Sequence, residues 1–216
     1  MKFRTCLTIC LLIVLLTAVG MVYLANGTSD FFSASPRPAT AATKSKPHHL
    51  MRIAQFDSHQ YVTQHEEQIW AASDCSAAAL AEVMNYYSHT YRIHDVLTVE
   101  IALHEITPQL GLLEDAGIQR TAAHFGFTTT WGYRLTLDQV INLARHGTPI
   151  MISFPPAKSA PLYPGGHVLI VTGGTSTTVF VADSSRLDRT SFSRSQFLDL
   201  WGGFSAMITP MKGGQR

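Results

Sequence analysis

The feature that most constrains this chain is a single cysteine, Cys75, at the start of an alanine-rich stretch. Apolar residues follow it at the spacing of one helix face: Leu80, Val83, Met84 and Tyr87. Ser73 and Asp74 are favourable N-cap residues directly before the alanines. The pattern therefore places a thiol at the positive end of a helix dipole, which favours the thiolate. By itself it fits a buried structural cysteine equally well.

The N-terminus contains a second constraint, an uncharged apolar run over residues 6–25 that follows Lys2 and Arg4. Twenty such residues match a membrane-spanning helix and exceed the apolar core of most signal peptides. The two basic residues predict a cytoplasmic N-terminus and an exported remainder. Residues 1–25 are thus expected to be a signal anchor, with a cleaved signal sequence and a secreted domain as the alternative. Residues 26–49, rich in Ser, Thr, Ala and Pro, are expected to be a flexible tether to a domain at 50–212.

Cysteine and charge content narrow the function. Cys6 and Cys10 lie in the apolar run, so Cys75 has no disulfide partner within the expected exported domain. An unpaired cysteine in an oxidising compartment favours a reactive thiol. The region after residue 50 is weakly acidic and has no basic stripe, which argues against a nucleic-acid partner. The chain also lacks a Gly-x-x-x-x-Gly-Lys motif, so no nucleotide is expected.

The order of the patterns predicts an α+β fold, with helices first and an antiparallel sheet second. Helices are expected at 75–87, 96–106, 112–125 and 137–146, and strands at 127–133, 149–154, 167–172, 178–183 and 204–209. A short helix is expected at 195–201. Two of these strands, 167–172 and 178–183, are joined by a Gly-rich turn, which is typical of a hairpin.

Two residues of that hairpin are the candidate partners of the thiol. A thiol nucleophile needs a base and a group that orients the base. His167 opens an apolar strand after a Gly-Gly loop, and Asp183 ends the partner strand. A hairpin closed between Thr172 and Thr178 places His167 and Asp183 opposite each other, at the distance of cross-strand neighbours.

The remaining part of such a site is an oxyanion hole. The backbone N–H of Cys75 is one expected donor, and the side-chain amide of Gln68, seven residues upstream, is the second. Metal binding is not expected: His48-His49 lacks further ligands, and His104-Glu105 is followed by Pro108 where a zinc-helix motif needs histidine.

Five segments in this order resemble the papain-like cysteine peptidases related to the bacteriocin-processing, double-glycine-leader family, a peptidase C39-like domain. They are residues 68–84, 143–152, 166–173, 179–183 and 197–201, and they include Asp74-Cys75-Ser-Ala and Gly166-His167-Val-Leu. The resemblance covers about residues 51–210. One departure is Ser76, which stands where the family typically has glycine and is expected to narrow the cleft beside the thiol.

The resemblance implies a papain-like α+β fold with N-terminal helices packed on a C-terminal sheet. It assigns Cys75, His167, Asp183 and Gln68 the roles of nucleophile, base, orienting acid and oxyanion donor. The expected function is a membrane-tethered, extracytoplasmic cysteine peptidase that acts on peptides or proteins without a cofactor. Two alternatives stay open: an inactive peptide-binding module of the same fold, and a transamidase or cell-wall peptide hydrolase.

Overall fold

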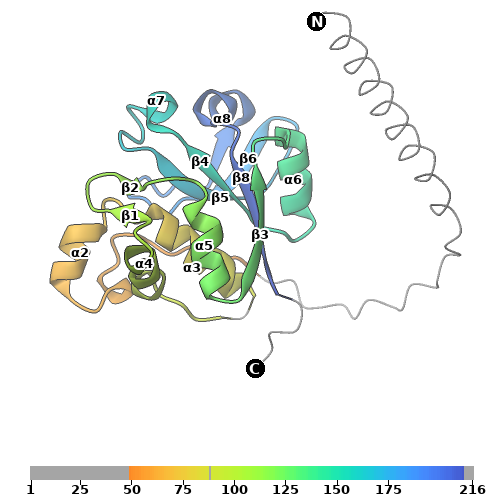
Figure 1. The fold of residues 1–216 in the computed structure, drawn as a ribbon. Helices are drawn as coiled ribbons and strands as arrows, with labels where there is room; N and C mark the ends of the chain where they lie inside the picture. The colour runs from red at the N-terminus through yellow and green to blue at the C-terminus, as the bar shows by residue number, and fades with distance from the viewer. Residues whose placement is uncertain (1–48, 88, 212–216) are drawn as a thin grey trace, which may run out of the picture. The chain divides into compact units, whose positions relative to one another are not determined.

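A six-stranded antiparallel sheet, in the order β3-β8-β4-β5-β6-β7, forms the centre of the computed structural model, which describes residues 49–87 and 89–211 (Figure 1). The strands are β3 (Phe127–Gly132), β4 (Ile150–Phe154), β5 (His167–Gly174), β6 (Thr178–Ala182), β7 (Ser191–Ser193) and β8 (Ser205–Pro210). A separate two-stranded hairpin pairs β1 (Ile106–Thr107) with β2 (Gly111–Leu112). The predicted α+β class is confirmed.

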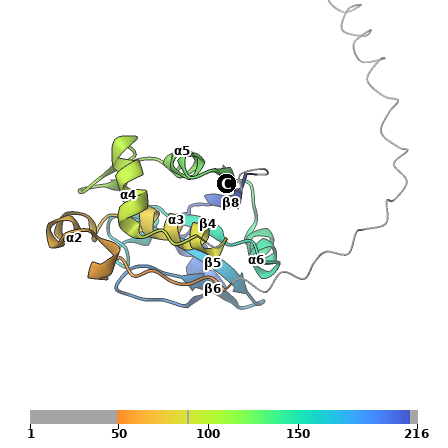
Figure 2. The same cartoon turned by 90° about the horizontal axis from the view of Figure 1, so that it is seen from below.

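The helices lie on both faces of the large sheet (Figures 1 and 2). They are the 3-10 helix η1 (Ser58–Gln60), α2 (Gln64–Trp70), α3 (Cys75–Tyr86), α4 (Ile93–Ala102), α5 (Gly117–His124), α6 (Leu137–Arg145), α7 (Pro156–Ser159) and α8 (Arg194–Leu200). Helix α3 packs against β5, with α4 and α5 beside it.

The central strands β4 and β5 are apolar on both faces, which explains why helices cover both. Along β4, Met151 belongs to the core that includes α3, α4 and α5, whereas Ile150 and Ile152 belong to the core that includes α6 and α8. Along β5, Ile170 and Leu169 divide in the same way. Successive side chains of a strand point to opposite faces, so a continuous apolar run is buried only between two layers.

Helix α6 follows its predicted pattern closely. Its apolar stripe of Leu137, Val140, Ile141 and Ala144 is buried, as expected. Thr136 accepts a hydrogen bond from the backbone of Gln139, whose side chain in turn accepts one from the backbone of Thr136. This capping box satisfies backbone donors that the first turn leaves free. It fixes where the helix starts and thereby how α6 meets the sheet.

Several predicted element boundaries were wrong between residues 60 and 126. The helix predicted at 96–106 is α4 at Ile93–Ala102, and residues 106–107 form β1 instead. The helix predicted at 112–125 begins only at Gly117, because Gly111 and Leu112 form β2. Helix α2 was not predicted: it has no buried residue, so it carries no apolar stripe to reveal it.

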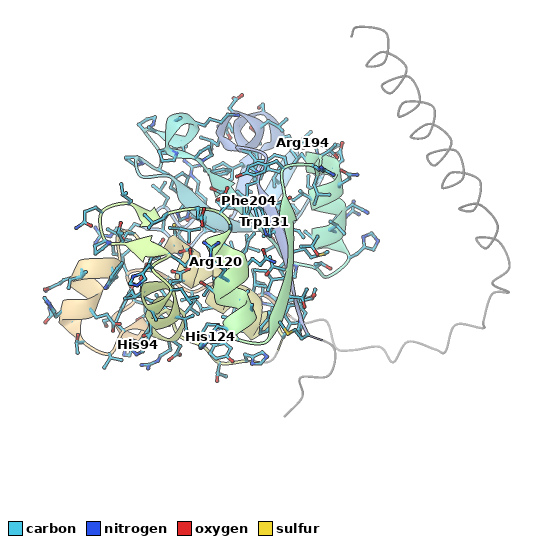
Figure 3. The ribbon with its side chains drawn as sticks, in the orientation of Figure 1. His94, Arg120, His124, Trp131, Arg194 and Phe204 are labelled. Carbon is cyan, nitrogen blue, oxygen red and sulfur yellow. The ribbon has the colours of Figure 1, made fainter. Side chains whose placement is uncertain are left out.

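An aromatic contact joins β3, the edge strand of the sheet, to the residue before β8. Trp131 of β3 and Phe204, directly before β8, lie beside each other with ring centroids 6.0 Å apart (Figure 3).

Over residues 49–87 and 89–211, no helix is both long and apolar enough to cross a membrane. The anchor predicted at 1–25 and nearly all of the tether predicted at 26–49 fall outside the described residues.

Candidate active site

The thiol of Cys75 occupies the first position of α3 and is partly exposed in a hollow of about 750 Å³. Its sulfur accepts a hydrogen bond from the backbone N–H of Val168, at 3.4 Å. Because Val168 is the second residue of β5, this contact joins the start of the helix to the start of the strand. The packing of α3 on β5 therefore holds the sulfur beside His167, the first residue of that strand.

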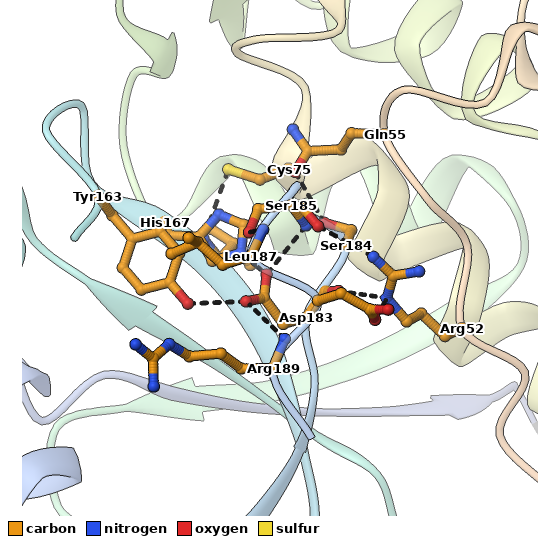
Figure 4. A network of polar contacts seen from close by, with 12 residues as sticks. Arg52, Gln55, Cys75, Tyr163, His167, Asp183, Ser184, Ser185, Leu187 and Arg189 are labelled. Carbon is orange, nitrogen blue, oxygen red and sulfur yellow. Dashed lines mark hydrogen bonds and ion pairs between the residues drawn. The ribbon is translucent and has the colours of Figure 1, made fainter. Parts of the chain in front are cut away.

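The imidazole of His167 lies between Cys75 and Asp183 (Figure 4). Its Nε2 is 2.8 Å from Oδ1 of Asp183, and both side chains are buried. Burial alone would lower the pKa of His167, but hydrogen bonds with Asp183 and Cys75 outweigh it and raise the pKa to about 9. With Nε2 bound to the carboxylate, Nδ1 is the ring nitrogen available to the sulfur.

Glycine at 166 allows His167 to take this position. Gly166 has a φ of +82°, a backbone conformation that residues with a side chain rarely adopt. A Cβ there would stand 3.0 Å from the carbonyl oxygen of Phe154 and 2.9 Å from Cδ of Pro156. Glycine is therefore needed at 166 so that the chain can turn tightly into β5.

The carboxylate of Asp183 is held by donors on both oxygens. Besides His167, it accepts hydrogen bonds from the hydroxyl of Tyr163 at 2.7 Å and from the backbone N–H groups of Ser185 at 2.9 Å and Arg189 at 3.3 Å. Burial disfavours its charge, yet these donors, above all His167, hold the pKa of Asp183 well below its usual range. Asp183 therefore stays ionised at neutral pH.

Tyr163 supports this pair in two ways, and the sequence did not reveal it. Its ring stacks on the imidazole of His167, with centroids 4.5 Å apart and planes 9° from parallel. Its hydroxyl donates to Asp183, as described above. The one sequence signal was its place in the Tyr-Pro-Gly-Gly loop before His167.

The predicted register of the β5–β6 hairpin was wrong, although the predicted contact forms. Ile170 pairs with Ala182 and Val171 with Val181, so Asp183 does not stand directly opposite His167. A bulge between Val171 and Gly173 shifts the ladder near the turn. The two side chains are diagonal neighbours on one face of the sheet, a distance that a histidine and an aspartate can span.

The structure does not bring Gln68 to the thiol. It lies on α2, its side chain is exposed, and it is not among the residues that line the hollow. Gln55 stands there instead: it is buried and lines the hollow together with Cys75. The prediction for Gln68 rested on its spacing from Cys75, but Gln68 belongs to α2, whereas Cys75 begins α3, so a short separation in the chain does not bring the two side chains together.

Ser76 does not narrow the cleft, contrary to expectation. Its side chain is fully buried and its hydroxyl donates to Oε2 of Glu100 on α4, at 3.0 Å. Ser76 is also absent from the lining of the hollow. The hydroxyl thus points into the helical layer, away from the space beside the thiol.

Several loops surround the hollow that contains the thiol, together with the start of α3 and the end of β4. Four exposed leucines line the hollow: Leu110, Leu113, Leu162 and Leu187. The charged side chains of the lining are few: Asp115, His167 and Arg186. The hollow is therefore mainly apolar at its rim and polar at its base. In the part of the chain that the structure describes, no three His, Cys, Asp or Glu side chains gather as a metal-ligand set.

Comparison with solved structures finds peptidase domains. The peptidase domain of Streptococcus ComA, a bi-functional ABC transporter involved in a quorum-sensing pathway, is 20% identical with a TM-score of 0.57; the match covers 76% of this chain and 100% of that one. The peptidase domain of Streptococcus mutans ComA is 17% identical with a TM-score of 0.45, covering 73% and 98%. A double glycine motif protease from an AMS/PCAT transporter, in complex with a leader peptide, is 16% identical with a TM-score of 0.45, covering 65% and 86%.

Sequence comparison gives the family. No curated protein matches the chain. The model of the Peptidase_C39 like family matches residues 56–207, well over half of the chain. That range contains Cys75, His167 and Asp183. The chain therefore belongs to the Peptidase_C39 like family, with a cysteine peptidase-like domain of papain-like α+β fold.

Proposed function

We propose that the protein is a cysteine peptidase that hydrolyses peptide amide bonds, with Cys75 as nucleophile, His167 as acid and base, and Asp183 as the group that orients His167. The observation that carries this proposal is the convergence of the three side chains, which come from α3, the start of β5 and the residue after β6. Family membership supports the same chemistry.

In the first half of the reaction, the sulfur of Cys75 attacks the carbonyl carbon and a C–S bond forms. The carbonyl electron pair moves onto oxygen, which becomes an oxyanion. When this intermediate collapses, the C–N bond breaks and Nδ1 of His167 gives its proton to the leaving amine. The raised pKa of His167, about 9, means that the ring carries that proton at neutral pH.

In the second half, a water molecule attacks the thioester carbon while His167 takes one of its protons. The resulting oxyanion collapses, the C–S bond breaks, and the carboxylic acid product leaves Cys75 as a thiolate beside a protonated imidazole. Asp183 remains ionised throughout and keeps Nε2 of His167 occupied, so Nδ1 faces the reacting atoms.

Gln55 replaces Gln68 in this proposal as the side-chain donor to the oxyanion, beside the backbone N–H of Cys75. Its amide is buried in the wall of the hollow, near the first residue of α3. Preorganised donors of this kind stabilise negative charge more strongly than water does.

A mixed peptide library tests the activity. Wild-type protein is expected to generate new peptide termini, identified by mass spectrometry, and Cys75→Ala to generate none while keeping its circular dichroism spectrum. Peptide capture without cleavage would instead indicate the binding module, and products joined to an added amine would indicate a transamidase. The one sequence feature that favoured the binding module was Ser76, and its hydroxyl points away from the cleft.

We also propose that this domain works outside the cytoplasm, held at the membrane by residues 1–25. The support comes from the apolar run, the two basic residues before it and the single cysteine of the domain. A fusion of alkaline phosphatase to the C-terminus is expected to be active if the domain is exported. An inactive alkaline phosphatase fusion, together with activity of a cytoplasmic reporter fused at the same position, would show that the domain stays in the cytoplasm.

A further inference from the structure

Gln55 is held at both ends of its side-chain amide. The hydroxyl of Ser184 donates to Oε1 at 2.9 Å, and Nε2 donates to Oδ1 of Asp74 at 3.2 Å. All three side chains are buried. When Asp74 is ionised, an amide turned the other way would set its oxygen against a carboxylate oxygen, which only accepts hydrogen bonds. Burial raises the pKa of Asp74 to about 7, so this preference is full above that pH. The two neighbours therefore select one of the two orientations of the amide.

Asp74 occupies the N-cap position of α3, yet it does not cap the helix. A side chain at this position commonly accepts a hydrogen bond from the first turn, and Asp74 makes none. Its second oxygen accepts from the hydroxyl of Tyr61 at 2.9 Å instead. Asp74, which directly precedes Cys75 in the chain, thus accepts hydrogen bonds from Gln55 and Tyr61 instead of from the first turn of α3.

Ser184 links the amide to the other side of the site. It follows Asp183 in the chain, and its carbonyl oxygen accepts from the backbone N–H of Gln55 at 2.9 Å. Arg52 donates to the carbonyl oxygens of Asp183 and Ser185, which holds the same two segments together. The amide is therefore fixed to the loop that carries the partner of His167 (Figure 4).

We infer that Asp74 and Ser184 are positioning residues that orient the Gln55 amide so that an N–H of Nε2 faces the oxyanion. The inference rests on the proposed function and goes beyond it. Nε2 of Gln55 donates to Oδ1 of Asp74 at 3.2 Å and more weakly to the carbonyl oxygen of Ala71, at 3.4 Å. The N–H that faces Ala71 is the one available to the substrate oxygen as its charge develops, because catalytic hydrogen bonds are often long in the free enzyme.

Two reactions of Cys75 separate orientation of Gln55 from activation of the thiol. Acylation by p-nitrophenyl acetate passes through a tetrahedral oxyanion and releases coloured p-nitrophenolate. Alkylation by iodoacetamide displaces iodide from a saturated carbon, and no oxyanion develops. A residue that acts only through the oxyanion donor affects the first rate and not the second. Neither reagent requires knowledge of the natural substrate.

The variants are Ser184→Ala, Asp74→Ala and Asp74→Asn, with Ser205→Ala as the matched control, since Ser205 is a buried serine on β8. Cys75→Ala gives the background rate. Ser184→Ala and Asp74→Ala are expected to slow acylation about tenfold or more, while the alkylation rate stays within about twofold of wild type. The reason is that a donor pointing in the wrong direction stabilises the oxyanion little better than a donor that has been removed. Asp74→Asn retains acylation, since its amide still offers an oxygen to Nε2 of Gln55.

Equal loss of both rates would overturn the inference, because it would mean damage to the thiol and its base. Unchanged acylation in both alanine variants would overturn it as well. If Asp74→Ala fails to fold, Ser184→Ala, which removes one hydroxyl group, decides the matter. If wild-type protein is alkylated but acylated no faster than Cys75→Ala, the proposed function itself fails, and that result differs from every outcome above.

Discussion

Replacement of Ser76 by alanine is expected to destabilise the protein without affecting the thiol. Ser76 and Glu100 are both fully buried, and the hydroxyl of Ser76 donates to Oε2 of Glu100. Within the described residues, Oε1 of Glu100 has no hydrogen-bond partner. Ser76→Ala would therefore leave both oxygens of a buried carboxyl group unpaired. The interaction matters because Ser76 directly follows the proposed nucleophile.

The size of the effect follows from the burial of the pair. Leaving a buried polar group unsatisfied costs about 1–3 kcal/mol. For a domain of this size, 1 kcal/mol shifts the unfolding midpoint by about 2–4 °C, so we expect a decrease of about 2–12 °C. Thermal unfolding followed by circular dichroism measures it at pH 6. Ser195→Ala, an exposed serine on α8, is the control, and its free energy of unfolding should change by less than about 0.5 kcal/mol.

A double-mutant cycle and a rate measurement complete this test. Glu100→Gln combined with Ser76→Ala should cost less than the sum of the two single changes, since the residues contact each other. The rate at which iodoacetamide alkylates Cys75 should stay at the wild-type value, because the hydroxyl of Ser76 points away from the cleft. An unchanged unfolding midpoint, or a large change in alkylation with normal stability, would refute this account of Ser76.

Three further predictions concern other residues. Gln55→Ala should slow acylation by p-nitrophenyl acetate about a hundredfold, as expected for loss of an oxyanion donor. Gln68→Ala should leave the acylation rate unchanged, and the reverse result would favour Gln68 as the donor. Tyr163→Phe keeps the ring but removes a donor to Asp183, so the free energy of unfolding in urea should fall by about 1.5–3 kcal/mol, and an unchanged midpoint would mean that this hydrogen bond contributes nothing. Burial raises the pKa of Glu100 from 4.5 to about 8, so the folded protein binds this proton more tightly than the unfolded chain does. The contribution of the bound proton to the free energy of unfolding is complete below about pH 4.5 and is lost as the pH rises through about 8. Glu100→Gln should therefore make thermal stability between pH 5 and pH 8 less dependent on pH, and an identical pH profile would contradict this assignment.

Three of the four predicted site residues could be located from sequence because each is marked by its own element. Cys75 begins a helix with an apolar stripe, His167 opens a strand, and Asp183 follows another. Each signal is local, and the hairpin connection made the pairing of His167 with Asp183 expected. The exact register was not predictable, because a bulge beside Gly173 depends on how the turn packs.

Gln55 could not be recognised because its role depends on contacts that are distant in the chain. Its partner Ser184 is 129 positions away, and Asp74 is 19 positions away across η1 and α2. Helix α2 was not predicted because none of its residues is buried, so its sequence has no apolar stripe at helical spacing. Likewise, the apolar stripe of α6 predicted a helix but not which face of the sheet it covers, since that depends on the connections between strands.

The measurement that tests the central claim most directly is the rate at which iodoacetamide alkylates Cys75 at pH 7 in wild-type protein and in His167→Ala. Iodoacetamide reacts with the thiolate, and an imidazole beside the sulfur favours that form by taking and holding its proton. The account predicts that His167→Ala slows alkylation about tenfold or more while the fold stays intact by circular dichroism. Equal rates in the two folded proteins would contradict it, because His167 would then play no part in activating Cys75.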